Sequence, residues 1–177
     1  MASRRALTGG TGDVNPQWFT MNATQSGADA TTTDSFPIPV QRLPQGRGAQ
    51  VMEVLKAVWW PGNTVVSAAS NTITVSLTTR NFGTTAVPLN EASQIVRWRR
   101  TITTSTAVGH MVNEEPYEFD LTDKAGHGML VATDSIFIQL VSTTTSQTVD
   151  AVIRLLYRWK NVGLAEYVGI VQSQTSS

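Results

Sequence analysis

The sequence predicts an all-β protein built as a single jelly roll, with two packed antiparallel four-stranded sheets and little or no helix. Several segments alternate apolar and polar residues with a period of two, and turn residues separate them. Threonine, a strand former, is abundant, while charged residues make up only 15% of the chain. About eight strands at this spacing suit a sandwich or jelly roll better than a propeller.

Composition divides the chain into three parts. Residues 1–48 are predicted to be a flexible N-terminal arm and a proline-rich lead-in, residues 49–172 the jelly-roll body, and residues 173–177 a C-terminal tail. Within the arm, residues 17–22 form a short strand or an aromatic anchor, and residues 25–35 form a loop. Three prolines between residues 36 and 48 exclude that segment from a sheet interior.

The body begins with its most apolar segment. Residues 50–60 are apolar on both faces except for Glu53 and Lys56, which predicts a central strand. Further strands are expected where apolar residues alternate or cluster between turns, at residues 72–79, 94–104, 116–121, 128–133 and 135–142.

The end of the body is predicted to be a closing β-hairpin. Residues 149–160 alternate over eleven positions between an apolar and a largely charged face. Asn161 and Gly163 tolerate positive φ and supply a turn. Residues 164–171 are rich in β-forming side chains and are expected to return as the second strand.

The charge balance, the cysteine count and the apolar segments exclude several classes of protein. The formal net charge is zero, so a globally basic nucleic-acid binder is not indicated. The chain contains no cysteine, which excludes disulfides, cysteine-zinc sites and thiol catalysis. Neither a secretory signal nor an apolar run of the roughly 18 to 20 residues that a membrane helix needs is present.

Catalytic and metal-binding motifs are absent from the sequence, so we expect no enzyme, no cofactor and no metal site. The two histidines, His110 and His127, stand in expected loops without partners at a meaningful spacing. Glu118 and Asp120 share one strand face, where their oxygens could hold Ca²⁺ at a subunit contact. A solvated acidic strand edge is the alternative that we favour.

Basic residues occur in small groups, and they are candidates for contact with nucleic acid. A basic surface would hold phosphates without reading sequence, whereas pairing with acids of neighbouring strands or subunits is the structural alternative. The candidates are Arg4, Arg5, Arg97, Arg99 and Arg100.

Exposed aromatic residues are the candidates for contacts between subunits, because such side chains anchor interfaces. Trp98 and Trp159 lie on apolar strand faces and are expected in the core. The adjacent Trp59 and Trp60 must point to opposite faces, which leaves one at a contact. The interface candidates are Trp18, Phe19, Phe36, Trp60 and Tyr167.

Two segments are similar to coat proteins of small circular Rep-encoding single-stranded DNA viruses, which are known as environmental, circovirus-like genomes. The first is VMEVLKAVWW at residues 51–60, and the second runs from LYRWK at 156–160 to LAEYVGIVQSQ at 164–174. Within the second, EYVGIVQ at 166–172 is the most specific part. The two segments cover about a quarter of the chain, and the middle agrees in pattern only.

The resemblance implies a capsid subunit that self-assembles into a small icosahedral shell of about sixty copies around a circular single-stranded DNA genome. It implies a virion protein that assembles in the host cell, with the nucleus as a candidate compartment, and has no membrane partner. Many such coat proteins carry a long arginine-rich arm, whereas only Arg4 and Arg5 stand in that region here. Packaging driven by the arm is therefore in doubt.

A binding module is the alternative from another class. A jelly roll that binds carbohydrate or a receptor as a monomer or trimer would carry a shallow aromatic site among its loops. A cupin-like enzyme is excluded because two isolated histidines cannot supply its converging metal ligands.

Overall fold

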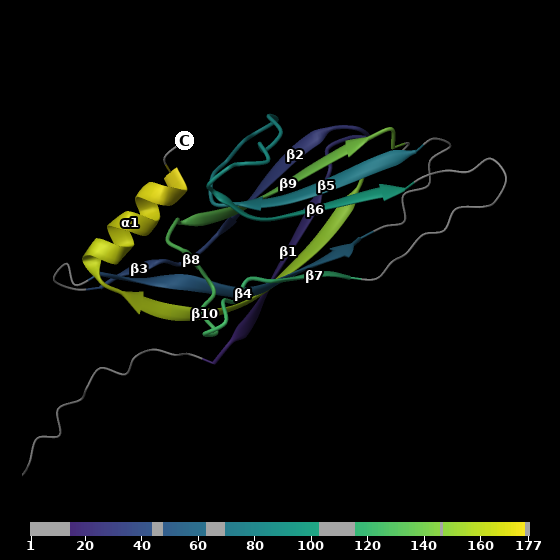
Figure 1. The fold of residues 1–177 in the computed structure, drawn as a ribbon. Coiled ribbons are helices and arrows are strands. Elements are labelled where there is room, and N and C mark those ends of the chain that lie inside the picture. The colour runs from purple at the N-terminus through teal and green to yellow at the C-terminus, as the bar shows by residue number, and fades with distance from the viewer. Residues whose placement is uncertain (1–14, 44–47, 63–69, 103–115, 146, 176–177) are drawn as a thin grey trace, which may run out of the picture.

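The computed structural model describes residues 15–43, 48–62, 70–102, 116–145 and 147–175. These residues form two antiparallel sheets that pack face to face, and one helix lies at one end of the sandwich (Figure 1). The predicted jelly roll is confirmed.

The first sheet, sheet A, is four positions wide. Its order is β1 (Gln17–Thr24), β10 (Asp150–Val162), β4 (Ala49–Pro61) and then three short strands along the remaining edge of β4. Those three, one after another along β4, are β3 (Gln41–Arg42), β8 (Met129–Val131) and β7 (Tyr117–Asp120). The apolar segment at residues 50–60 is thus a central strand, as predicted.

The second sheet, sheet B, has the order β2 (Thr31–Pro37), β9 (Ser135–Thr143), β5 (Asn71–Thr78) and β6 (Gln94–Ile102). The core between the sheets is apolar and contains Trp59 and Trp98, whose ring centroids lie 6.3 Å apart. Trp159 is half-buried against this core. Trp59 also stacks on Tyr117 with a centroid distance of 4.9 Å.

The boundary expected at residue 49 does not mark the start of the sheets. β1 pairs with β10 along its whole length, and β2 pairs with β9. Residues 31–35, expected in a loop, therefore belong to a strand. β2 is an edge strand and ends at Pro37, which agrees with the exclusion of proline from a sheet interior.

The prediction that a second strand completes a closing hairpin is wrong. Residues Leu164–Thr175 form helix α1, which also replaces the tail expected from residue 173. A hydrogen bond of 2.9 Å from Tyr167 N to Gly163 O forms the first turn of the helix, which begins directly after β10. Tyr167, Ile170 and Val171 pack on one apolar cluster, so a helical stripe overrides the β propensity of the valines.

Candidate subunit interface

The outer face of sheet A has a covered half and an open half, and a bulge in β4 separates them. Leu156 pairs with Lys56 but Tyr157 pairs with Val54, so Leu55 is an extra residue in β4. Before the bulge the outward residues of β4 are Ala49, Val51 and Glu53, and after it they are Lys56, Val58 and Trp60.

Helix α1 covers the first half. Its side chains pack on a small cluster formed by Ala49, Val51, Ala132 and Val162. At its C-terminal end, the Gln174 side chain accepts a hydrogen bond from Ala132 N at 3.1 Å and donates one to Leu130 O at 2.6 Å. Gln174 is 4% exposed, so the amide is fixed inside this contact.

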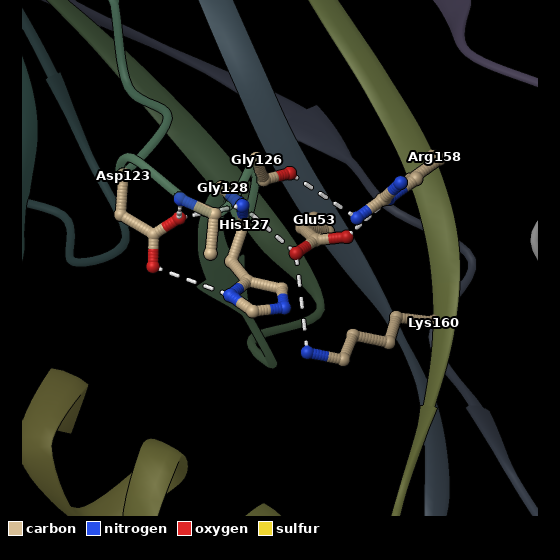
Figure 2. Close-up of polar contacts among 8 residues, drawn as sticks. Glu53, Asp123, Gly126, His127, Gly128, Arg158 and Lys160 are labelled. Atoms are coloured by element: carbon tan, nitrogen blue, oxygen red, sulfur yellow. Dashed lines mark hydrogen bonds and ion pairs between the residues drawn. The ribbon is translucent and has the colours of Figure 1, made fainter.

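Glu53 is the ionic centre of the covered half (Figure 2). Its side chain is fully buried, and its carboxylate accepts a hydrogen bond from Nε of Arg158, the residue opposite it on β10. It also accepts one from Gly128 N at 3.0 Å, and Lys160 Nζ lies 3.9 Å from Oε1. Two cations and one amide therefore compensate the buried charge.

The turn between β7 and β8 brings Gly128 to Glu53. Asp123 Oδ1 accepts hydrogen bonds from the amides of Ala125 and His127, both 2.8 Å long, and Gly126 adopts a φ of 80°. A Cβ at Gly128 would lie 2.2 Å from Val54 O, so only glycine permits this close approach to β4. His127 Nδ1 lies 3.2 Å from Asp123 Oδ2, which gives this histidine a local partner.

The surroundings of these carboxylates decide their ionisation. Burial by itself would raise the pKa of Glu53, but the hydrogen bonds from Arg158 and Gly128 and the charges of Arg158 and Lys160 hold it below its ordinary value. The hydrogen bond from the His127 amide is the main cause that lowers the pKa of Asp123. Both groups are anions at neutral pH.

The open half carries the two exposed tryptophans of sheet A. We call it the tryptophan face. Trp18 of β1 is 46% exposed and Trp60 of β4 is 41% exposed. The guanidinium of Arg154 lies over the Trp18 ring, 4.7 Å from its centroid. The remaining outward residues of this half, from four adjacent strands, are Thr20, Asn22, Val152, Leu156, Lys56, Val58, Glu118 and Asp120.

Charges of both signs border the tryptophan face. Lys56 Nζ donates a hydrogen bond to Glu118 Oε2 at 2.9 Å, and this bond raises the pKa of Lys56. Asp120 accepts hydrogen bonds from Thr122 N at 2.9 Å and Thr122 Oγ1 at 2.7 Å, which lower its pKa. Each carboxylate of the suggested calcium pair thus has a protein partner. Among the described residues, no three His, Cys, Asp or Glu residues gather as a metal site.

Exposure separates the five interface candidates. Trp18 and Trp60 are exposed, whereas Phe19, Phe36 and Tyr167 are half-buried against their own chain. Phe19 packs edge-on against Tyr157 with a centroid distance of 6.5 Å. Phe36 packs on the core between the sheets, and Tyr167 packs beneath α1. Of the five candidates, only the two tryptophans are exposed, and both lie on the outer face of sheet A.

The arginines of β6 do not form one surface. Arg99 is exposed and Arg97 half-buried on the outer face of sheet B, but Arg100 points to the core side and is 6% exposed. The alternation of β6 places Arg100 on the same face as Trp98 and Ile102. The prediction that Arg97, Arg99 and Arg100 form one basic surface is therefore wrong for Arg100. Arg4, Arg5 and His110 lie outside the described residues.

Sequence reasoning missed the segment that joins β5 to β6, residues 79–93, which folds back over the outer face of sheet B (Figure 1). Gln139 of β9 is 1% exposed. Its side-chain amide accepts a hydrogen bond from Val87 N at 2.9 Å and donates one to Thr85 O at 2.8 Å. Arg97 donates to Val87 O at 3.1 Å. A buried glutamine in a strand was the one signal available, since such an amide needs partners.

Comparison with known proteins gives structural relatives only. No protein-family model matches the chain, and no curated protein matches it in sequence. In the described part of the chain, no helix has the length and apolar character needed to cross a membrane.

The chain is similar in structure to polyomavirus VP1 capsid proteins. VP1 of Trichodysplasia spinulosa-associated polyomavirus, solved with 3'-sialyllactose, has a TM-score of 0.54 at 8% identity and covers 85% of this chain and 97% of its own. The VP1 pentamer of human polyomavirus 7 has a TM-score of 0.51 at 10% identity, covering 82% and 95%. VP1 of human polyomavirus 12, solved with 3'-sialyllactosamine, has a TM-score of 0.51 at 9% identity, covering 83% and 100%. At these identities the likeness establishes a shared jelly-roll fold.

Proposed function

We propose that this chain is a viral structural protein, a capsid subunit that self-assembles and catalyses no reaction. The observation that carries the proposal is the structural match to VP1 capsid proteins. The match covers 82–85% of this chain and 95–100% of each VP1 chain. The resemblance of residues 51–60 and 156–174 to coat proteins of circular single-stranded DNA viruses supports the same role from an independent direction. On that basis the shell has about sixty copies, encloses a circular single-stranded DNA genome and forms in the host cell, with the nucleus as a candidate compartment.

The tryptophan face is the surface that we assign to contact between copies. Its two exposed tryptophans provide apolar anchors, and its border provides complementary charges, with Lys56 beside Glu118 and Asp120. A face that carries both signs can pair with the same face of a second copy. The remainder of the outer face of sheet A is already occupied by α1.

Nucleic-acid contact is restricted by burial to the exposed candidates. Arg99 is accessible on β6, and Arg97 is partly engaged with Val87 O. Together with Arg4 and Arg5, these residues would hold phosphates without reading sequence. Arg100, at 6% exposure, is unsuited to a polymer backbone.

Size-exclusion chromatography with light scattering tests the proposal, with absorbance at 260 and 280 nm recorded on the same peak. Sixty chains of 19.2 kDa would give about 1.15 MDa. A high 260/280 ratio on that species assigns the basic residues to nucleic acid, and a low ratio indicates shells closed by protein contacts. A monomer or trimer at every salt concentration and pH would overturn the capsid role.

Glycan binding is the second candidate, favoured by the relatives that were solved with sialylated oligosaccharides. Titration of the chain with 3'-sialyllactose, followed by nuclear magnetic resonance of the sugar, tests it directly. Saturable binding by a species that never exceeds a trimer would support the binding module instead of the capsid. Binding by assembled particles would be compatible with both activities, as one surface function of a shell.

A further inference from the structure

A group of buried polar atoms without partners lies at one end of the sandwich interior. Within the described part of the chain, these atoms are Arg100 Nη2, both side-chain polar atoms of Asn71, and the indole nitrogens of Trp59 and Trp98. Each side chain is at least nine-tenths buried, with exposures of 6% for Arg100, 1% for Asn71, 0% for Trp59 and 6% for Trp98. A sixth such atom, Gln94 Oε1, lies at the opposite end of β6.

Strand register places Trp98, Arg100 and Asn71 on the inward face of sheet B, toward the end where β6 finishes and β5 begins. Arg100 and Trp98 are two positions apart on β6 and share its inward face. Arg100 pairs with Ile73, so Asn71 is its diagonal neighbour on β5, a Cβ separation of about 7–8 Å. Trp59 approaches from sheet A, with its ring centroid 6.3 Å from that of Trp98.

Neighbouring buried polar groups are, by contrast, fully used. Ser142, which pairs with Ile73 on β9, donates to Gln25 Oε1 at 3.0 Å. Gln25 Oε1 also accepts from Val149 N at 3.1 Å, and Gln25 Nε2 donates to Ala30 O at 2.6 Å. The fold thus satisfies polar groups at this end of the core, and the unpartnered set around Arg100 requires a specific explanation.

The chemistry of the unpartnered atoms defines what is missing. Four of the five are hydrogen-bond donors, and one of these donors belongs to the guanidinium of Arg100. A buried guanidinium nitrogen without an acceptor is costly, and further unpartnered donors near it favour an acceptor with negative charge. Guanidinium groups match oxyanions such as phosphate in geometry.

We propose that this end of the sandwich interior binds one small oxyanion of the phosphate or sulfate class, held by Arg100, Asn71 and the indole donors of Trp59 and Trp98. The low exposure of Arg100 admits a small free anion and excludes the backbone of a nucleic acid. The inference does not depend on the proposed capsid role, because it concerns the interior of a single chain.

Thermal unfolding of the full chain, in phosphate and in chloride at equal ionic strength, tests the proposal together with equilibrium dialysis against labelled phosphate. Wild-type protein is expected to unfold at a higher temperature in phosphate and to bind about one phosphate per chain. Arg100→Gln should weaken phosphate binding at least about tenfold, and Trp98→Phe, which removes a donor but keeps the ring packing, about two- to tenfold. Lys124→Gln is the control, since it removes an exposed cation from the turn between β7 and β8, away from the residues assigned to phosphate.

The outcomes separate the alternatives. If wild-type protein neither binds phosphate nor gains stability in it, the proposal is overturned. Equal binding by wild type and Trp98→Phe overturns it even where Arg100→Gln fails to fold. A short single-stranded oligonucleotide that competes for the Arg100 site would likewise contradict it, because that site would then accept a polymer phosphate.

Discussion

Nε of Arg158 donates a hydrogen bond to the fully buried carboxylate of Glu53, directly across the pairing of β10 with β4. The same carboxylate receives the amide of Gly128, so one buried anion joins the central strands to the turn between β7 and β8. Lys160 is the second cation near it.

Stability is expected to fall on acidification because of Glu53. Its pKa is lowered in the folded chain from an ordinary value of 4.5, so the unfolded chain takes up the proton first. The contribution is complete above about pH 4.5 and is lost as the pH falls through the lower pKa of the folded state. Urea unfolding at a series of pH values measures this slope.

Glu53→Gln should destabilise the chain by about 3 kcal/mol at pH 7, because Arg158 loses its charged partner in a site that is largely desolvated. The variant should also have a flatter pH dependence than wild type below about pH 4.5, where the folded-state pKa of Glu53 lies. Glu118→Gln, which removes an exposed carboxylate paired to Lys56, is the control and should change stability by less than about 1 kcal/mol. Equal acid sensitivity of Glu53→Gln and wild type would show that another carboxylate governs it.

Loss of the two exposed tryptophans should prevent assembly. Trp18→Ser with Trp60→Ser removes apolar anchors that each contribute about 2 kcal/mol or more at an interface, and leaves the core intact. Light scattering should then find small species where wild type forms large ones. Leu89→Ser is the control, since Leu89 is 82% exposed but lies outside the tryptophan face. Normal assembly of the double variant would remove this face from the subunit contact.

Gln139→Leu should release the segment at residues 79–93 from sheet B. It leaves the buried Val87 N without its side-chain acceptor, at a cost of about 1–3 kcal/mol, and also removes the hydrogen bond to Thr85 O. Faster amide hydrogen exchange at Val87 is the measurement. Thr31→Val, on the neighbouring strand and the same outer face, is a control that should leave this exchange unchanged.

Much of the fold could be predicted because it follows local rules. The segment at 50–60 is apolar on both faces and forms β4. This strand has neighbouring strands on both sides, and helix α1 covers half of its outer face. The alternation at residues 149–160 became β10. In β6, alternation with a period of two likewise assigns Arg100 to the inward face beside Trp98. The prediction that grouped Arg100 with Arg97 and Arg99, because they are close in sequence, overlooked this signal.

Other features depended on contacts that sequence patterns do not encode. Residues 164–171 have β-forming side chains, and only the spacing of Tyr167, Ile170, Val171 and Gln174 along one helical face indicates α1. Strand β2 has little apolar content, and its place is fixed by pairing with β9. The open half of sheet A could be located only once the bulge at Leu55 and the position of α1 were known.

The Gln174 amide has a consequence for how copies can meet. Leu130 O on β8 and Ala132 N, directly after β8, are an acceptor and a donor of the kind that an incoming strand would use to extend sheet A. Because a side chain already satisfies both, this part of the edge of sheet A offers no template for edge-to-edge polymerisation. Growth by added strands is blocked there, and in the proposed capsid role this favours contact through faces over edge-to-edge growth.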